Sequence, residues 1–164
     1  MILPMTNDFP EYVCPYAKRL ASRSPRFARQ CYDPRSGNQT IKQSNNQTIE
    51  HFSPDPFGEL THASKCPGLK QRFPDRVLVM TTDKCFGYCA HCTRKWILGK
   101  SKVVETDAEL SACVDYVTSH PKVRDVLLSG GDVLTLSDAK VMRFVNAFVK
   151  LPQVEVVRVC TRAL

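Results

Sequence analysis

The feature that most constrains this fold is a regular alternation of strand and helix patterns after Arg76. Short apolar runs at Arg76–Thr82, Val123–Asp132 and Val154–Cys160 are typical of strands, and the first is fit for burial on both faces. Between them, Asp107–His120 and Ser137–Lys150 carry apolar residues at helical spacing. The pattern predicts an α/β fold with three parallel strands joined by crossover helices.

Both predicted helices begin with residues that favour capping. Thr106 precedes the first helix and Glu109 follows three positions later, which is the spacing of a capping box. Ser137 can cap the second helix. Because crossovers between parallel strands are right-handed, we expect the loop after the first strand and the turn Ser129–Asp132 to lie side by side at the carboxyl ends of the strands.

Three of the eight cysteines are clustered in that first loop, where Cys85, Cys89 and Cys92 have the spacing C-x3-C-x2-C. Three thiolates on one tight loop can bind three corners of a four-iron cluster and leave one iron open. A zinc ion with His91 as its fourth ligand is the second interpretation. The third is that the cysteines bind no metal.

The other five cysteines are scattered singly, and Cys113 and Cys160 stand in apolar settings typical of small buried residues. The opening MILPMTNDFPEY has no features of a secretory signal, so we expect a cytoplasmic location and no disulfide framework.

The composition is that of a globular protein, with 43% hydrophobic and 24% charged residues among 164, and it has no apolar run long enough for a membrane span. The net charge of +7 is concentrated in part between Asp83 and Glu105, where five basic residues and no acid occur. Aromatic residues are not interleaved with these bases, which disfavours nucleic acid as a partner.

The first part of the chain has a different texture. Residues 1–70 are expected to form an irregular or helical amino-terminal extension, with a polar insertion near 36–51 in which NQTI occurs twice. Prolines up to Pro74 favour extended or turn structure before Arg76.

Several motifs together resemble one family. TTDKCFGYCAHCTRK at Thr81–Lys95, the preceding PGLKQRFPDRVL, and the later LLSGGDVL are similar to segments of the lysine 2,3-aminomutase family of radical S-adenosylmethionine (SAM) enzymes. The resemblance covers roughly Pro10 to Leu164, apart from the NQTI insertion. It implies that residues 71–164 form a truncated radical SAM core, a partial (β/α) barrel of three parallel strands.

The resemblance also implies cofactors. Cys85, Cys89 and Cys92 would hold a [4Fe-4S] cluster whose open iron binds SAM, and one-electron reduction from a donor would produce a 5′-deoxyadenosyl radical. The resemblance implies that SAM is bound by His91 in the cysteine loop and by the glycine-rich turn of Ser129, Gly130, Gly131 and Asp132.

Further positions match residues for pyridoxal 5′-phosphate (PLP) and substrate. Arg72 matches the arginine that contacts PLP, and Arg94 matches the arginine that pairs with the substrate carboxylate. The family's imine-forming lysine lies beyond Leu164, and no catalytic residue is assigned here. Phe73 and Gln71 replace a tyrosine and a histidine of the usual motif, and Lys95-Trp96 replaces arginines.

The expected function is therefore PLP-dependent 1,2-amino migration on a small amino acid, with lysine, glutamate or a protein lysine all open as substrate. Completion would come from further sequence, an oligomer or a second polypeptide. The alternatives are a non-catalytic iron–sulfur or zinc module and an inactive truncated gene product.

Overall fold

The computed structural model describes residues 66–87, 89, 92–94, 97–99 and 101–163, together with 19, 22–24, 55 and 57–60. The chain divides into two compact units, one of Met1–Pro56 with Phe86–Trp96 and one of Phe57–Cys85 with Ile97–Leu164, and each is treated by itself. The polar insertion at 36–51 and most of the predicted extension lie outside the described residues.

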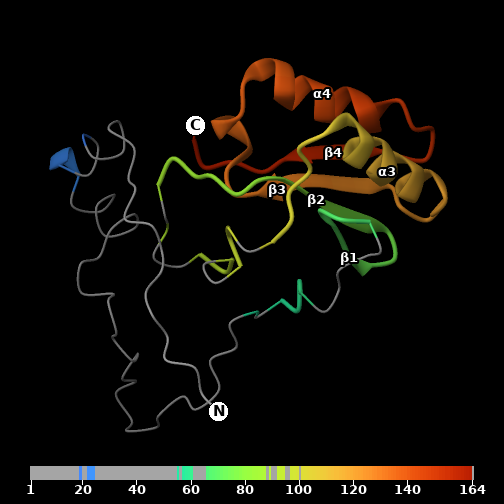
Figure 1. The fold of residues 1–164 in the computed structure, drawn as a ribbon, viewed down its shortest axis with the longest axis horizontal. Helices are drawn as coiled ribbons and strands as arrows, with labels where there is room; N and C mark the ends of the chain where they lie inside the picture. Colours follow the sequence, from blue (N-terminus) through green and yellow to red (C-terminus); the bar gives the residue numbers. More distant parts are fainter. Residues whose placement is uncertain are drawn as a thin grey trace, which may run out of the picture. The chain divides into compact units, whose positions relative to one another are not determined.

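The second unit is built on a four-stranded mixed sheet in the order β1-β2-β3-β4 (Figure 1). Its strands are β1 (Leu69–Phe73), β2 (Arg76–Thr82), β3 (Asp125–Gly130) and β4 (Val156–Val159). β2, β3 and β4 are parallel, which confirms the α/β class and the three predicted parallel strands. The sheet is open, so a barrel is not formed by these strands.

Strand β1 agrees with the extended structure expected before Arg76 and adds a regular strand that the sequence analysis did not predict. It pairs antiparallel with β2, and Leu69 lies opposite Val79. Pro67 and Pro74 flank the strand and do not interrupt it, so no ladder N–H is lost to a proline ring. The prolines thus bound a five-residue extended segment, and its pairing with β2 makes that segment a strand.

The two predicted helices are present as α3 (Asp107–Thr118) and α4 (Asp138–Val149), and a short 3-10 helix, η1 (Val133–Thr135), follows β3. The capping box of α3 is confirmed, because the N–H of Glu109 donates to Thr106 Oγ1 (3.2 Å) and the N–H of Thr106 donates to Glu109 Oε2 (3.0 Å). Ser137 occupies the N-cap position of α4, but its side chain makes no capping hydrogen bond.

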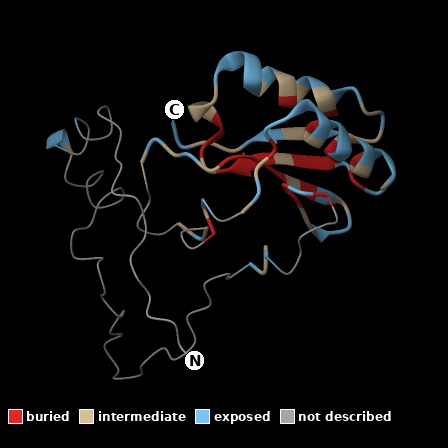
Figure 2. Ribbon diagram, in the orientation of Figure 1, coloured by how far each residue is buried: buried red, intermediate tan, exposed pale blue. Residues whose placement is uncertain are grey.

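The hydrophobic core lies between one face of the sheet and the helices α3 and α4 (Figure 2). The helices contribute Cys113 and Val117 of α3 and Phe144 and Phe148 of α4. Cys113 is fully buried, as predicted, whereas Cys160 is only partly buried at the end of the edge strand β4. On the sheet, the core residues are alternate members of β2 and β3, namely Val77, Val79, Val126 and Leu128.

Strand alternation places the intervening residues on the opposite face, here called the helix-free face because no described α-helix packs on it. It carries Leu78 and Met80 of β2, Asp125 and Leu127 of β3, and Arg158 of β4, which lies opposite Leu127.

Candidate functional site

The glycine-rich turn after β3 is hydrogen-bonded to the residues that lead from β2 into the cysteine loop. The N–H of Gly131 donates to the carbonyl oxygen of Thr82 (2.6 Å), and the N–H of Asp132 donates to that of Lys84 (2.7 Å). Thr135 Oγ1 is also 3.5 Å from the Lys84 carbonyl oxygen. The predicted proximity of the two motifs is thus confirmed for the start of the cysteine loop.

Neither glycine of this turn has room for a side chain. Gly130 has φ = 113°, a conformation that L-residues rarely adopt. A Cβ atom there would collide with the carbonyl oxygen of Thr82, and a Cβ on Gly131 would collide with the carbonyl group of Lys84. Close backbone approach explains why the sequence has two glycines in succession.

The carboxylate of Asp132 is buried and is bound by its own chain. It accepts hydrogen bonds from the N–H of Leu134 (3.0 Å), from Thr161 Oγ1 (2.6 Å) and from the N–H of Arg162 (2.9 Å). Asp132 therefore caps η1 and fastens the segment after β4 to the turn. Sequence reasoning overlooked Thr161 and Arg162, although their place directly after the third strand pattern was a usable signal.

Ser129, the remaining residue predicted in this turn, is the penultimate residue of β3 and is 4% exposed. Its carbonyl oxygen accepts a hydrogen bond from Thr81 Oγ1 (2.9 Å). This bond joins the carboxyl ends of β2 and β3 next to the glycines.

The three clustered cysteines are each partly buried. Cys85 ends the sheet-bearing unit, whereas Cys89, Cys92 and Arg94 belong to the other unit. Within the latter, the N–H of Cys92 donates to the carbonyl oxygen of Cys89 (3.0 Å), which closes a tight turn between the two thiols. His91 lies outside the described residues.

In the part of the chain that the structure describes, no three His, Cys, Asp or Glu side chains are already gathered as metal ligands. The donor set itself fits an iron–sulfur cluster, because three thiols with partial solvent access follow one another in a short loop.

Arg72 is exposed and lies at the other end of the sheet from the glycine turn. Its guanidinium carbon is 5.5 Å from the ring centroid of Phe73, and that of Arg76 is 5.3 Å from the same ring. Phe73 pairs with Arg76, the first residue of β2, so the length of β2 separates Arg72 from Lys84, about 20 Å at the usual rise per residue. Within the sheet-bearing unit, Arg72 therefore lies at the opposite end of β2 from Lys84.

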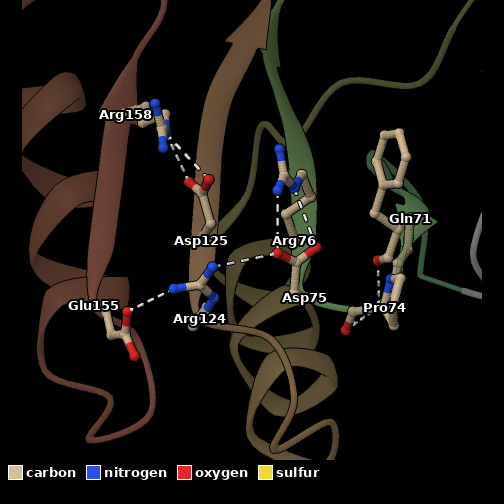
Figure 3. A network of polar contacts seen from close by, with 9 residues as sticks. Gln71, Pro74, Asp75, Arg76, Arg124, Asp125, Glu155 and Arg158 are labelled. Atoms are coloured by element: carbon tan, nitrogen blue, oxygen red, sulfur yellow. Dashed lines mark hydrogen bonds and ion pairs between the residues drawn. The ribbon is translucent and has the colours of Figure 1, made fainter.

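Near this amino end of the parallel strands, ion pairs join neighbouring strands (Figure 3). Arg158 Nε is 2.9 Å from Asp125 Oδ1 across β3 and β4, and Arg124 Nη1 is 3.0 Å from Glu155 Oε2. The pKa of Asp75 lies below its ordinary value, chiefly because the side chain of Arg76 donates hydrogen bonds to it. Sequence reasoning did not predict this network, which ties strand ends together on the side away from the glycine turn.

No helix among the described residues has the length and apolar character needed to cross a membrane.

Comparison with known proteins finds several similar aminomutases. The chain is 34% identical over 166 aligned residues to L-lysine 2,3-aminomutase of Clostridium subterminale, covering 98% of this chain and 40% of that protein. It is 43% identical over 99 residues to L-lysine 2,3-aminomutase of Acetoanaerobium sticklandii, covering 60% of this chain and 24% of the relative. Glutamate 2,3-aminomutase of Clostridioides difficile is 35% identical over 111 residues, covering 67% of this chain and 26% of the relative.

The chain thus spans 40% or less of the length of these relatives. No protein-family model matches it.

Proposed function

Because the chain belongs to the lysine 2,3-aminomutase family, we propose that it provides the cluster-binding and SAM-binding part of a radical SAM aminomutase. The reaction would be a PLP-dependent 1,2-amino migration on a lysine-like amino acid. The observation that carries this proposal is the hydrogen bonding of the Gly130–Asp132 turn to Thr82 and Lys84, at the mouth of the cysteine loop.

Cys85, Cys89 and Cys92 would hold a [4Fe-4S] cluster as thiolates. When bound and reduced by an electron donor, the cluster supplies the electron that splits SAM and yields a 5′-deoxyadenosyl radical. Five basic residues and no acid stand between Asp83 and Glu105, and although Lys102 pairs with Glu109, this local positive charge would favour the thiolate form of the cysteines. The reducing cytoplasm, where thiols stay available to metals, suits this chemistry.

SAM would lie against the turn of Ser129, Gly130, Gly131 and Asp132, with His91 on the cysteine loop as a further contact. The two successive glycines let this turn pack directly against the carbonyl groups of Thr82 and Lys84, which holds the turn beside the start of the cysteine loop. The carboxylate of Asp132 is already engaged by Leu134, Thr161 and Arg162, so its part would be to hold the turn in shape.

The two predicted arginines would bind anions. Arg94 would pair with the substrate carboxylate through its planar fork of donors. Arg72 would contact PLP, since its guanidinium makes no ion pair with a described carboxylate and faces Phe73. Arg72 lies at the other end of the sheet from the glycine turn, so the contact that it would make with PLP is separate from the contacts that SAM would make at that turn.

We further propose that β2, β3 and β4 form part of a (β/α) barrel that additional strands complete, from further sequence or a second polypeptide. The exposed edge of β4 supports this, because Val156 and Val159 are 41% and 38% exposed.

The test is anaerobic reconstitution of the chain with iron and sulfide. We expect the broad visible absorbance of an iron–sulfur cluster, bound iron and sulfide in equal amounts, and a reduced EPR signal that changes when SAM is added. The Cys89→Ala variant should lose most of the bound iron, whereas Cys160→Ala, which removes a partly buried thiol outside the triad, should retain it.

A colourless protein that retains zinc would overturn the proposal. A cluster that forms normally but whose EPR signal SAM leaves unchanged would reduce the chain to a non-catalytic iron–sulfur module.

A further inference from the structure

Two cysteines that the sequence scatters far apart meet in the hydrophobic core. The Sγ atoms of Cys66 and Cys113 are 3.3 Å apart, although the residues are separated by 47 positions. Cys66 lies just before β1, and Cys113 lies in the middle of α3. Both belong to the sheet-bearing unit, so their separation is set within one compact body.

The two thiols differ in their access to solvent. Cys113 is 0% exposed and Cys66 is 7% exposed. Burial raises the pKa of the Cys113 thiol, and the neighbouring Cys66 raises it further, so Cys113 stays protonated at neutral pH. Cys66 is therefore the sulfur that a small oxidant in solvent reaches first.

We propose that Cys66 and Cys113 form an oxidisable thiol pair that closes to a reversible disulfide when the protein meets hydrogen peroxide. The separation of 3.3 Å between the sulfur atoms has to shorten to about 2.0 Å for a disulfide bond.

The reaction balances with peroxide as the oxidant. The Cys66 sulfur attacks one peroxide oxygen, the O–O bond breaks, and a sulfenic acid and one water form. The Cys113 sulfur then attacks the sulfenic sulfur, loses its proton and expels a second water as the S–S bond forms. Two thiols are oxidised by two electrons, and peroxide is reduced to two waters. A dithiol reductant reverses the bond by thiol–disulfide exchange.

Closing this bond has a structural consequence. It joins the chain before β1 to α3 and makes a covalent loop that contains β1, β2 and all three clustered cysteines. Because a cross-link between distant residues limits the unfolded chain, the oxidised form should resist unfolding more than the reduced form.

The experiment uses the full chain, reduced, freed of metal and treated with substoichiometric hydrogen peroxide. After alkylation of the remaining thiols and digestion with trypsin, we expect the peptide 66–70 joined to 103–122, at a mass about 2 Da below the sum of the two reduced peptides. The joined peptide should be absent before peroxide is added, appear on treatment and disappear with a dithiol. The melting temperature should rise by several degrees on oxidation.

Two variants give the controls. Cys66→Ser should abolish both the joined peptide and the rise in melting temperature, and Cys160→Ser should leave both intact. If the Cys66→Ser variant folds poorly, peptide mapping of the unchanged chain still decides. Separate alkylation of Cys66 and Cys113 after peroxide, or equal yields of disulfides among all cysteines, would overturn the proposal.

Discussion

At the level of single residues, the candidate site depends on two glycines, because a side chain at either position would collide with neighbouring backbone. Gly130 and Gly131 are both limited by close backbone contacts, but only Gly130 also has a positive φ. Gly99 offers a natural comparison, because it has φ = 75° and no atom within 4 Å of a would-be Cβ. Gly130 and Gly99 both have a positive φ, and of the two only Gly130 is also crowded by a neighbouring backbone carbonyl.

We predict that Gly130→Ala destabilises the chain more than Gly99→Ala does. Both variants pay about 1 kcal/mol for the unfavourable φ, and only Gly130→Ala also forces the Thr82 carbonyl to move. Chemical denaturation of the two variants measures the difference. If the two variants lost the same unfolding free energy, the Thr82 carbonyl group would be able to move aside for the new methyl group without cost.

Asp132 is the second residue whose role the structure sharpens. We predict that Asp132→Ala costs about 2 kcal/mol of unfolding free energy, since the N–H groups of Leu134 and Arg162 lose their acceptor. Denaturant unfolding checks this, with Asp115→Ala as a control that removes an exposed carboxylate from α3. If Asp132→Ala lost no more unfolding free energy than Asp115→Ala, the hydrogen bonds of Asp132 would not be what fastens the segment after β4 to the turn.

At the scale of elements, the start of α3 combines local and non-local contacts around one carboxylate. The pKa of Glu109 is lowered from 4.5 to about 2, first by the hydrogen bond from Lys102 and then by those from the N–H groups of Thr106 and Glu105. Lys102 Nζ lies 2.8 Å from Glu109 Oε1. The capping box was readable from sequence spacing, whereas the approach of Lys102 was not.

The sign of the pH dependence follows from this lowered pKa. Glu109 binds its proton less readily when folded, so its contribution to stability is complete above pH 4.5 and is lost as pH falls towards 2. We predict that Glu109→Gln makes the denaturation midpoint less dependent on pH between 5 and 2 than in the unchanged chain. Parallel pH profiles of the two proteins would count against the lowered pKa.

At the scale of the whole molecule, the sheet has a protected centre and an open side. β2 and β3 each have a strand on both sides, and their core-facing residues Val77, Val79, Val126 and Leu128 are at most 1% exposed. β4 has a neighbour only on one side among the described strands, and three of its four residues are exposed.

We predict that amides of β4 exchange with solvent about tenfold faster than those of β3, because edge strands open at lower free energy than central ones. Hydrogen exchange followed by mass spectrometry measures both strands in one experiment. Equal protection would indicate that another strand or a second copy covers the edge of β4 in solution.

Most of the strands and helices could be predicted from the sequence, and the contacts of the candidate site only in part. Local patterns sufficed for β2, β3, β4, α3 and α4, because short apolar runs are typical of strands and apolar residues at helical spacing are typical of helices. The strand β1 was not predicted, because its sequence LKQRF contributes only Leu69 to the core and its regular structure depends on pairing with β2. The proximity of the Gly130–Asp132 turn to the cysteine loop followed from right-handed topology alone.

The alternating α/β order, the capping box of α3 and the motifs of the family could all be predicted from the sequence, since all three depend on local spacing. Only the tertiary structure decided that Asp132 binds Thr161 and Arg162, that Arg72 lies far from the glycine turn, and that Cys66 meets Cys113. These facts join residues far apart in the chain, and such contacts are set by how strands and helices pack, which no local pattern encodes.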